Sequence, residues 1–176
     1  MPTVPPETAL RRVLSISAID GWSVALIAGA CTVISLLVGS GIGVIVGLLV
    51  TTAGAVELHG HRRLVQGNVC GVGALVAAQV IILVTIVVYA VTNLLRYDEA
   101  ALLAQLTPRH HDLLARAGLS FADLRPMLKP FYAALYSTVM GVTVLFQGGL
   151  ALFYHSRKPQ IAAALRAWKD GPPPLP

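Results

Sequence analysis

The feature that most constrains this chain is an apolar run, Gly21–Val56, that contains no charged residue. As a single α-helix, with a rise of about 1.5 Å per residue, the run would measure roughly 54 Å. The hydrocarbon core of a bilayer is only ~30 Å thick. Residues 39–41 have the sequence Gly-Ser-Gly near the middle of the run, and such residues end helices and form turns. The run therefore predicts two transmembrane helices, 22–38 and 42–58, joined by a tight hairpin.

The composition of the whole chain supports the same class of protein. Of its 176 residues, 56% are hydrophobic and 12% are charged, whereas soluble domains carry about 25% charged residues. The formal net charge of +5 requires no nucleic acid as a partner. Basic residues beside membrane-embedded segments commonly meet anionic lipid headgroups. We therefore expect the lipid bilayer as the main partner and an integral, multi-pass location in a plasma membrane, such as a bacterial inner membrane.

Two further apolar stretches complete the predicted membrane part. Residues 68–95 carry no charge and predict a third transmembrane helix, and residues 130–155, with aromatic residues at both ends, predict a fourth. The fold class predicted is an all-α integral membrane protein with four transmembrane helices and short interfacial helices.

The segments outside these spans are short. Residues 1–20 are predicted to form a cytoplasmic or interfacial segment with a short amphipathic helix, or else a plain extension of the first span. Residues 96–129 predict an extracytoplasmic loop with two or three short helices. Residues 156–176 predict a cytoplasmic amphipathic helix followed by a proline-rich tail, which cannot be helical.

The distribution of Lys and Arg predicts the orientation. With four spans, both termini and the connection between spans two and three lie on one side of the membrane. That side carries eight basic residues: Arg11, Arg12, Arg62, Arg63, Arg157, Lys158, Arg166 and Lys169. The other side carries five, in a loop that also contains acids. The positive-inside rule therefore places both termini in the cytoplasm.

Small residues recur along two of the predicted spans and indicate where helices can approach closely. They are Gly43, Gly47 and Gly54 in the second span and Ala133, Ser137 and Gly141 in the fourth. The glycines of the second span either pack against the other arm of the hairpin or form a contact with another subunit.

The segment around Glu57 has the sequence Glu-Leu-His-Gly-His. If the helix continues, Glu57 and His61 lie one turn apart on one face, and His59 lies nearby. Three interpretations follow: an interfacial Glu57 paired with a neighbouring Arg or His, a proton or ion site, and a metal or haem site. Two or three ligands do not complete a zinc shell, so no metal and no cofactor are predicted.

Few strongly polar residues lie within the spans. Gln79 lies near the middle of the third span, Gln147 lies in the fourth, and Thr51 lies in the second. Such residues either join helices by hydrogen bonds or, together with Glu57, line a polar pathway.

The sequence contains no recognisable catalytic motif, so we expect no enzyme. The first functional hypothesis is a structural or accessory subunit of a homo-oligomer or a larger membrane assembly. The alternative is a small channel or transporter that uses Glu57, Gln79, Gln147 and Thr51. The third is an intramembrane metal-binding, haem-binding or catalytic protein that uses Glu57, His59 and His61.

Overall fold

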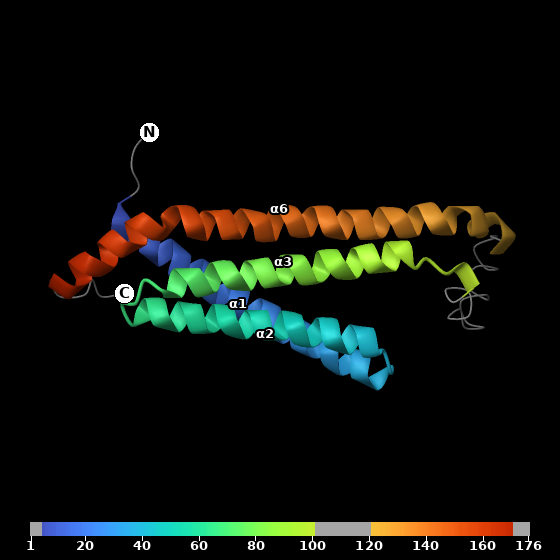
Figure 1. Cartoon of the computed structure of the whole chain (residues 1–176), viewed down its shortest axis with the longest axis horizontal. Coiled ribbons are helices and arrows are strands. Elements are labelled where there is room, and N and C mark those ends of the chain that lie inside the picture. The colour runs from blue at the N-terminus through green and yellow to red at the C-terminus, as the bar shows by residue number, and fades with distance from the viewer. Residues whose placement is uncertain (1–4, 101–120, 171–176) are drawn as a thin grey trace. The chain divides into compact units, whose positions relative to one another are not determined.

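The computed structural model of the chain describes residues 5–100 and 121–170, and within them it is helical apart from the turns. The helices are α1 (Pro6–Leu37), α2 (Gly41–Val65), α3 (Gly71–Leu95) and α6 (Phe121–Asp170) (Figure 1). Each of the four contains a segment long and apolar enough to cross a membrane. The prediction of an all-α chain with four candidate spans is therefore confirmed. Most of the predicted loop of residues 96–129 lies outside the described residues.

The turn between α1 and α2 lies at the Gly-Ser-Gly sequence that predicts it. Gly39 has a φ of 76°, which glycine adopts at little cost. Its N–H donates to the carbonyl of Leu36, and the N–H of Ser40 donates to the carbonyl of Ser35. These two bonds form a Schellman motif, which satisfies carbonyls at the end of α1. The hydroxyl of Ser40 then accepts from the N–H of Gly43 and caps α2.

The turn between α2 and α3 repeats this design. Gly67 has a φ of 79°, its N–H donates to the carbonyl of Leu64, and the N–H of Asn68 donates to the carbonyl of Arg63. The side chain of Asn68 accepts from the N–H of Cys70, immediately before α3 begins. Two turns of the same kind therefore set α1, α2 and α3 as successive antiparallel helices.

The structure distinguishes the two alternatives predicted for residues 1–20. From Pro6 onward these residues extend the first span, because α1 runs without interruption through Asp20 and Gly21. A glycine inside a helix costs only about 1 kcal/mol relative to alanine, and Gly21 is buried against Leu58 of α2. Packing between the two helices therefore outweighs the local preference for a turn.

The structure also shows longer helices than predicted elsewhere. The second span was expected to end near residue 58, yet α2 continues through Gly60 to Val65. The fourth span and the C-terminal helix were expected to be separate, yet α6 is one helix that contains Pro159. Figure 1 shows that α6 bends toward its C-terminal end. Because proline lacks the N–H of an i→i−4 bond, it bends a helix without necessarily ending it.

The described chain divides into two compact units. Among the described residues, the first unit comprises residues 5–86 and 143–170, and the second comprises residues 87–100 and 121–142. The core of the first unit joins the beginning of α1, the end of α2, the beginning of α3 and the last part of α6. Its buried residues are Leu10, Val13, Leu64, Val72, Leu75, Tyr154, Ile161, Ala164 and Leu165.

This core changes the interpretation of the two predicted interfacial helices. The apolar faces around Val13 and Ile161 were expected to lie on the membrane surface. Both side chains are instead fully buried in the core of the first unit. The amphipathic pattern of these segments was correctly recognised, but a pattern of this kind does not distinguish a lipid surface from a neighbouring helix.

The second unit contains a cluster of tyrosine rings. The ring centroids of Tyr132 and Tyr136 are 4.7 Å apart, those of Tyr97 and Tyr132 are 5.2 Å apart, and those of Tyr89 and Tyr136 are 6.1 Å apart. The hydroxyl of Tyr132 lies 3.4 Å from the carbonyl of Asn93, which is a long hydrogen bond. An exposed ion pair joins Arg125 to Glu99.

The small residues of the two spans have different surroundings. A Cβ added at Gly43 would meet Ser35 of α1, one at Gly47 would meet Thr32, and one at Gly54 would lie 2.9 Å from the backbone nitrogen of Ala25. The glycines of α2 thus face the other arm of the hairpin.

The small residues of α6 have different surroundings. Ala133, Ser137 and Gly141 are exposed, and a Cβ added at Gly141 would meet nothing within 4 Å.

Candidate functional site

A buried carboxyl group on α2 is the centre of the candidate site. Glu57 has no solvent-exposed surface in this structure. One of its carboxyl oxygens, Oε1, accepts a hydrogen bond of 3.0 Å from the hydroxyl of Tyr154 on α6. The other, Oε2, accepts a hydrogen bond of 3.0 Å from Nε2 of Gln79 on α3. Three helices therefore meet at this one side chain.

A second carboxyl group completes the cluster. The same Nε2 of Gln79 donates to Oδ2 of Asp20 on α1, over 2.9 Å. The amide of Gln79 therefore bridges one carboxyl oxygen of Asp20 and one of Glu57. We refer to Asp20 and Glu57 as the carboxyl pair. The carboxyl pair, Gln79 and Tyr154 form one polar cluster. Each of the four helices of the first unit contributes one of its side chains.

The close approach of α1 and α2 at glycine residues brings the carboxyl pair together. A Cβ added at Gly21 would lie 3.0 Å from the side chain of Leu58 and 3.4 Å from Cγ of Glu57. One turn before Leu58 on α2, a Cβ added at Gly54 would lie 2.9 Å from the backbone nitrogen of Ala25. Larger side chains at these two positions would hold the helices apart, and the carboxyl of Asp20 would no longer reach Gln79.

A second close approach sets α3 against α2. A Cβ added at Gly60 would lie 2.9 Å from the carbonyl oxygen of Gly71, and one added at Gly71 would lie 2.5 Å from the carbonyl oxygen of Gly60. Glu57 on α2 and Gln79 on α3 each lie roughly 12 Å along their helices from the turn between them, at about 1.5 Å per residue. This equal depth brings Gln79 level with Glu57.

The pair has no basic partner within the part of the chain that the structure describes. Arg125 with Glu99 is the ion pair found among those residues, and it belongs to the second unit. Two carboxylates side by side in an apolar interior would repel each other strongly, since little water screens them. The arrangement is therefore suited to holding one proton between Asp20 and Glu57.

Gln79 suits a site whose protonation changes. Its amide carries two N–H donors and one carbonyl acceptor. The donors satisfy two carboxylate oxygens, while Oε1 is buried and has no hydrogen-bond partner among the described residues. If the amide turns over, its carbonyl accepts from a protonated carboxyl instead. A glutamine can thus adapt to either protonation state, which a permanently charged Lys or Arg cannot do.

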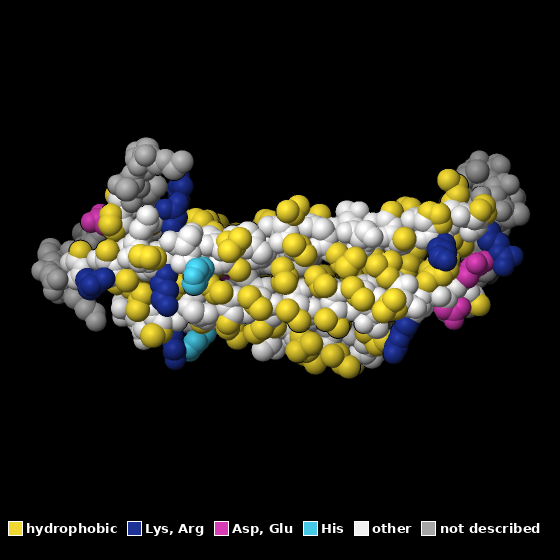
Figure 2. All heavy atoms as spheres, turned by 45° about the horizontal axis from the view of Figure 1, so that its top comes forward, with side chains coloured by type: hydrophobic (Ala, Val, Ile, Leu, Met, Phe, Trp, Pro, Cys, Tyr) yellow, Lys and Arg dark blue, Asp and Glu magenta, His cyan; other side chains and the backbone are white. Residues whose placement is uncertain are grey.

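His61 follows Glu57 by one turn of α2 and contacts Ser17 of α1. It lies toward the end of the first unit where basic side chains gather, which we call the basic end. The Nδ1 atom of His61 lies 3.0 Å from the hydroxyl oxygen of Ser17, which also donates to the carbonyl of Leu14 over 3.2 Å. Ser17 has no exposed surface, whereas His61 is partly exposed. Figure 2 shows histidine, lysine and arginine side chains gathered at this end of the first unit.

The structure joins only some of the polar residues singled out in the sequence. Glu57 and Gln79 are hydrogen-bonded to each other. Thr51 donates instead to the carbonyl of Gly47 on its own helix. The buried Oε1 of Gln147 has no partner among the described residues, so neither Thr51 nor Gln147 belongs to the cluster.

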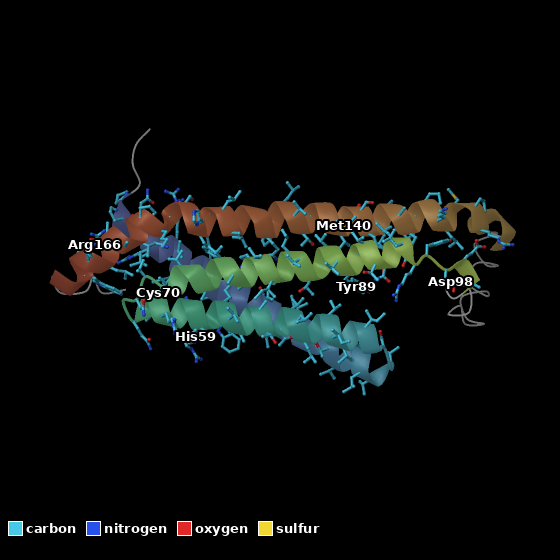
Figure 3. All side chains as sticks on the ribbon, viewed as in Figure 1. His59, Cys70, Tyr89, Asp98, Met140 and Arg166 are labelled. Atoms are coloured by element: carbon cyan, nitrogen blue, oxygen red, sulfur yellow. The ribbon has the colours of Figure 1, made fainter. Side chains whose placement is uncertain are left out.

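The proposed metal or haem ligands do not converge. The side chain of His59 is exposed and points away from α3 (Figure 3), whereas Glu57 is buried and His61 contacts Ser17. Within the described residues, no group of three His, Cys, Asp or Glu side chains is arranged to hold a metal ion. The geometry therefore gives no support to a site built from these three residues.

Sequence reasoning missed three residues of the site. The sequence patterns single out none of Asp20, Tyr154 and Ser17 as a candidate site residue. One signal was available for Asp20: it directly precedes the charge-free run that ends at Glu57, so both acids border the same apolar hairpin. For Tyr154 no local signal existed, because its contact with Glu57 spans 97 residues of sequence.

The surface of the hairpin is apolar. Large hydrophobic side chains on α1 and α2 are well exposed, among them Leu26 at 65% and Leu37 at 81%. Such exposure is unusual for a soluble protein and typical of helices that face lipid. Comparisons of the chain with protein-family models, with curated proteins and with solved structures found no match.

Proposed function

We propose that the chain is a multi-pass membrane protein that translocates protons, with Asp20 and Glu57 as its proton-binding site. This proposal develops the channel or transporter hypothesis rather than the accessory-subunit hypothesis. The observation that supports it most directly is the full burial of Glu57 beside a second carboxyl, with Gln79 and Tyr154 as neutral partners.

A purely structural role explains this arrangement poorly. Burying a polar group without adequate partners costs several kcal/mol, and apolar side chains of similar volume commonly replace buried ionic groups without loss of stability. Ionisable residues inside membrane helices tend to mark ion pathways and proton relays. Two acids without a basic partner among the described residues favour a role in which charge is gained and lost.

The chemistry of the cycle follows from the carboxyl pair. With one proton bound, the pair carries one negative charge, and the proton is shared between an oxygen of Asp20 and an oxygen of Glu57. Release of that proton leaves two carboxylates, which the amide of Gln79 and the hydroxyl of Tyr154 stabilise only in part. Repulsion between the carboxylates then drives the uptake of the next proton.

Proton flux into proteoliposomes tests the proposal. Vesicles with an entrapped pH-sensitive dye are placed under a membrane potential and, separately, under outward gradients of Na⁺ or K⁺. We expect the wild-type protein to acidify the vesicle interior faster than it is acidified in protein-free vesicles. Glu57→Gln is expected to lower this rate by about 10-fold or more, because a positioned proton-transferring group contributes about 10²–10⁴-fold to the rate of proton transfer. Glu99→Gln, at the exposed ion pair of the second unit, is the matched control.

Two outcomes would contradict the proposal. One is wild-type flux equal to that of protein-free vesicles under all these gradients. The other is flux that is unchanged in both Glu57→Gln and Asp20→Asn.

An exposed stripe of small residues on α6 favours a second candidate function, an accessory subunit. Ala133, Ser137 and Gly141 form an exposed stripe on α6, and a Cβ at Gly141 would find open space. Small residues of this kind allow another membrane helix to approach closely. Mass measurement in mild detergent tests this role: an oligomer that Gly141→Leu dissociates would support it, whereas a monomer in both proteins would argue against it.

A further inference from the structure

The contact between His61 and Ser17 lies between the carboxyl pair and the exposed basic end of the first unit. We propose that His61 and Ser17 form the proton relay that connects the carboxyl pair with the aqueous side nearest the turn between α2 and α3. This inference rests on the proton-binding role proposed above, and it names the route by which the proton arrives.

The register of the helices supports the relay. Ser17 precedes Asp20 by one turn of α1, and His61 follows Glu57 by one turn of α2. Side chains one turn apart on a helix have Cβ atoms about 5–6 Å apart, and a single water molecule can bridge such a gap by hydrogen bonds. The relay and the carboxyl pair therefore lie in successive layers between the same two helices.

The hydrogen bonds of Ser17 allow a proton to pass in either direction. A hydroxyl carries one donor proton and can accept at the same time. While Ser17 donates to the carbonyl of Leu14, its oxygen accepts from Nδ1–H of His61; after rotation, the hydroxyl donates to Nδ1 instead. The side chain of His61 is partly exposed, so water can deliver a proton to the imidazole or take one from it.

In the transfer step, one proton enters at His61 and one arrives at the carboxyl pair. A proton from water binds Nε2 of His61 and forms an imidazolium ion. The proton on Nδ1 passes to the oxygen of Ser17, whose own hydroxyl proton passes through water to the carboxyl pair. The imidazole is left neutral, with its proton on Nε2, so one positive charge has moved inward and no bond other than O–H and N–H bonds has changed.

The surrounding charged and titratable groups are consistent with this direction of transfer. Asp20 on α1 and Glu57 on α2 attract the proton, whereas Arg62 on α2 repels charge at His61. From α3 the neutral amide of Gln79 faces the pair, and from α6 the hydroxyl of Tyr154 does so. A proton held briefly on His61 is thus driven toward the carboxyl pair.

Time-resolved infrared spectroscopy of the purified full-length protein tests the relay. A laser pulse releases a caged proton, and the rise of the protonated-carboxyl band reports its arrival at the pair. Loss of the band in Glu57→Gln or Asp20→Asn assigns it. We expect His61→Ala to slow the rise by about 10-fold or more without lowering its final amplitude, and Ser17→Ala to slow it as well.

Two comparisons separate chemistry from packing. Free imidazole in the buffer is expected to restore the rate in His61→Ala, because it replaces the missing proton carrier. His59→Ala, which removes an exposed histidine from the same helix, is expected to leave the rate unchanged. A wild-type rate in His61→Ala, or a slow rate that imidazole does not restore, would overturn the relay. A missing carboxyl band in the wild type would overturn the proton-binding site itself and the relay with it.

Discussion

The two units use tyrosine and glutamate in opposite ways. In the first unit, Tyr154 is fully buried and its hydroxyl donates to the buried Glu57. In the second unit, Tyr97 packs its ring against Tyr132, while its buried hydroxyl has no hydrogen-bond partner among the described residues. Glu99 of the second unit pairs with Arg125 at the surface. The same residue types thus form a polar site in one unit and an aromatic cluster with a surface ion pair in the other.

The two kinds of contact are expected to contribute differently to stability. A buried polar group that several helices satisfy fixes their positions and is costly to disturb. A ring cluster contributes mainly apolar contact area and about 0.5–1.5 kcal/mol for each favourable ring pair. We therefore expect the same type of substitution to change stability by different amounts in the two units. In two cases the changes in stability are expected to have opposite signs.

The largest contrast is expected for glycine substitutions. Gly60→Ala places a Cβ 2.9 Å from the carbonyl oxygen of Gly71, and such overpacking typically destabilises by about 1–3 kcal/mol. Gly141→Ala meets nothing within 4 Å, so the better helix propensity of alanine should stabilise by up to ~1 kcal/mol. Thermal unfolding in detergent measures both variants. Equal shifts in the melting temperature would contradict the close contact between α2 and α3.

The next contrast concerns the two glutamates. Glu57→Ala leaves the buried donors of Gln79 and Tyr154 without their acceptor, at a cost of about 1–3 kcal/mol for unsatisfied buried groups. Glu99→Ala breaks an exposed ion pair, which contributes about 0–1 kcal/mol. Denaturant titration of both variants is the measurement. If Glu99→Ala proved the more destabilising, Glu57 could not be the central side chain of its unit.

The smallest contrast concerns single hydroxyl groups. Tyr154→Phe removes a donor to Glu57 and is expected to destabilise by about 0.5–1.5 kcal/mol. Tyr97→Phe removes a buried hydroxyl that has no partner among the described residues, so its effect should be neutral or slightly stabilising.

Burial also raises the pKa of Tyr97 above its ordinary value of 10.0. The neutral phenol is thus the form that the fold favours. Its contribution to stability is present below pH 10 and is lost as the pH rises through the raised pKa. A tyrosinate absorbance titration of wild type minus Tyr97→Phe measures this pKa, and a value at or below 10 would contradict the burial of the hydroxyl.

The sequence predicted the fold class better than it predicted the lengths of the helices. Charge-free runs and the Gly-Ser-Gly cluster indicated four apolar helices and the turn after α1, because both signals are local. The continuity of α1 through Gly21 and of α6 through Pro159 could not be predicted in this way. In both cases packing between helices offsets a local preference to break, and packing partners are not visible in a single stretch of sequence.

The site was predictable only in part for the same reason. Glu57 and Gln79 stood out because strongly polar residues are rare in apolar runs. Asp20 and Tyr154 did not, since an acid before a glycine and a tyrosine near the end of a span both have common local explanations. Only the arrangement of four helices reveals that these side chains share one hydrogen-bonded cluster.

The position of Glu57 along α2 has an electrical consequence. The residue lies roughly 12 Å from Val65, at about 1.5 Å per residue. In the proposed membrane arrangement, with Val65 at the edge of the hydrocarbon core, this depth is less than half of the ~30 Å thickness. A full crossing of the membrane by one charge corresponds to about 2.3 kcal/mol per 100 mV. Moving one proton from the nearer side of the membrane to the proposed site would therefore involve electrical work of less than about 1 kcal/mol per 100 mV. Most of the membrane voltage would act on the proton as it moves between Glu57 and the opposite side.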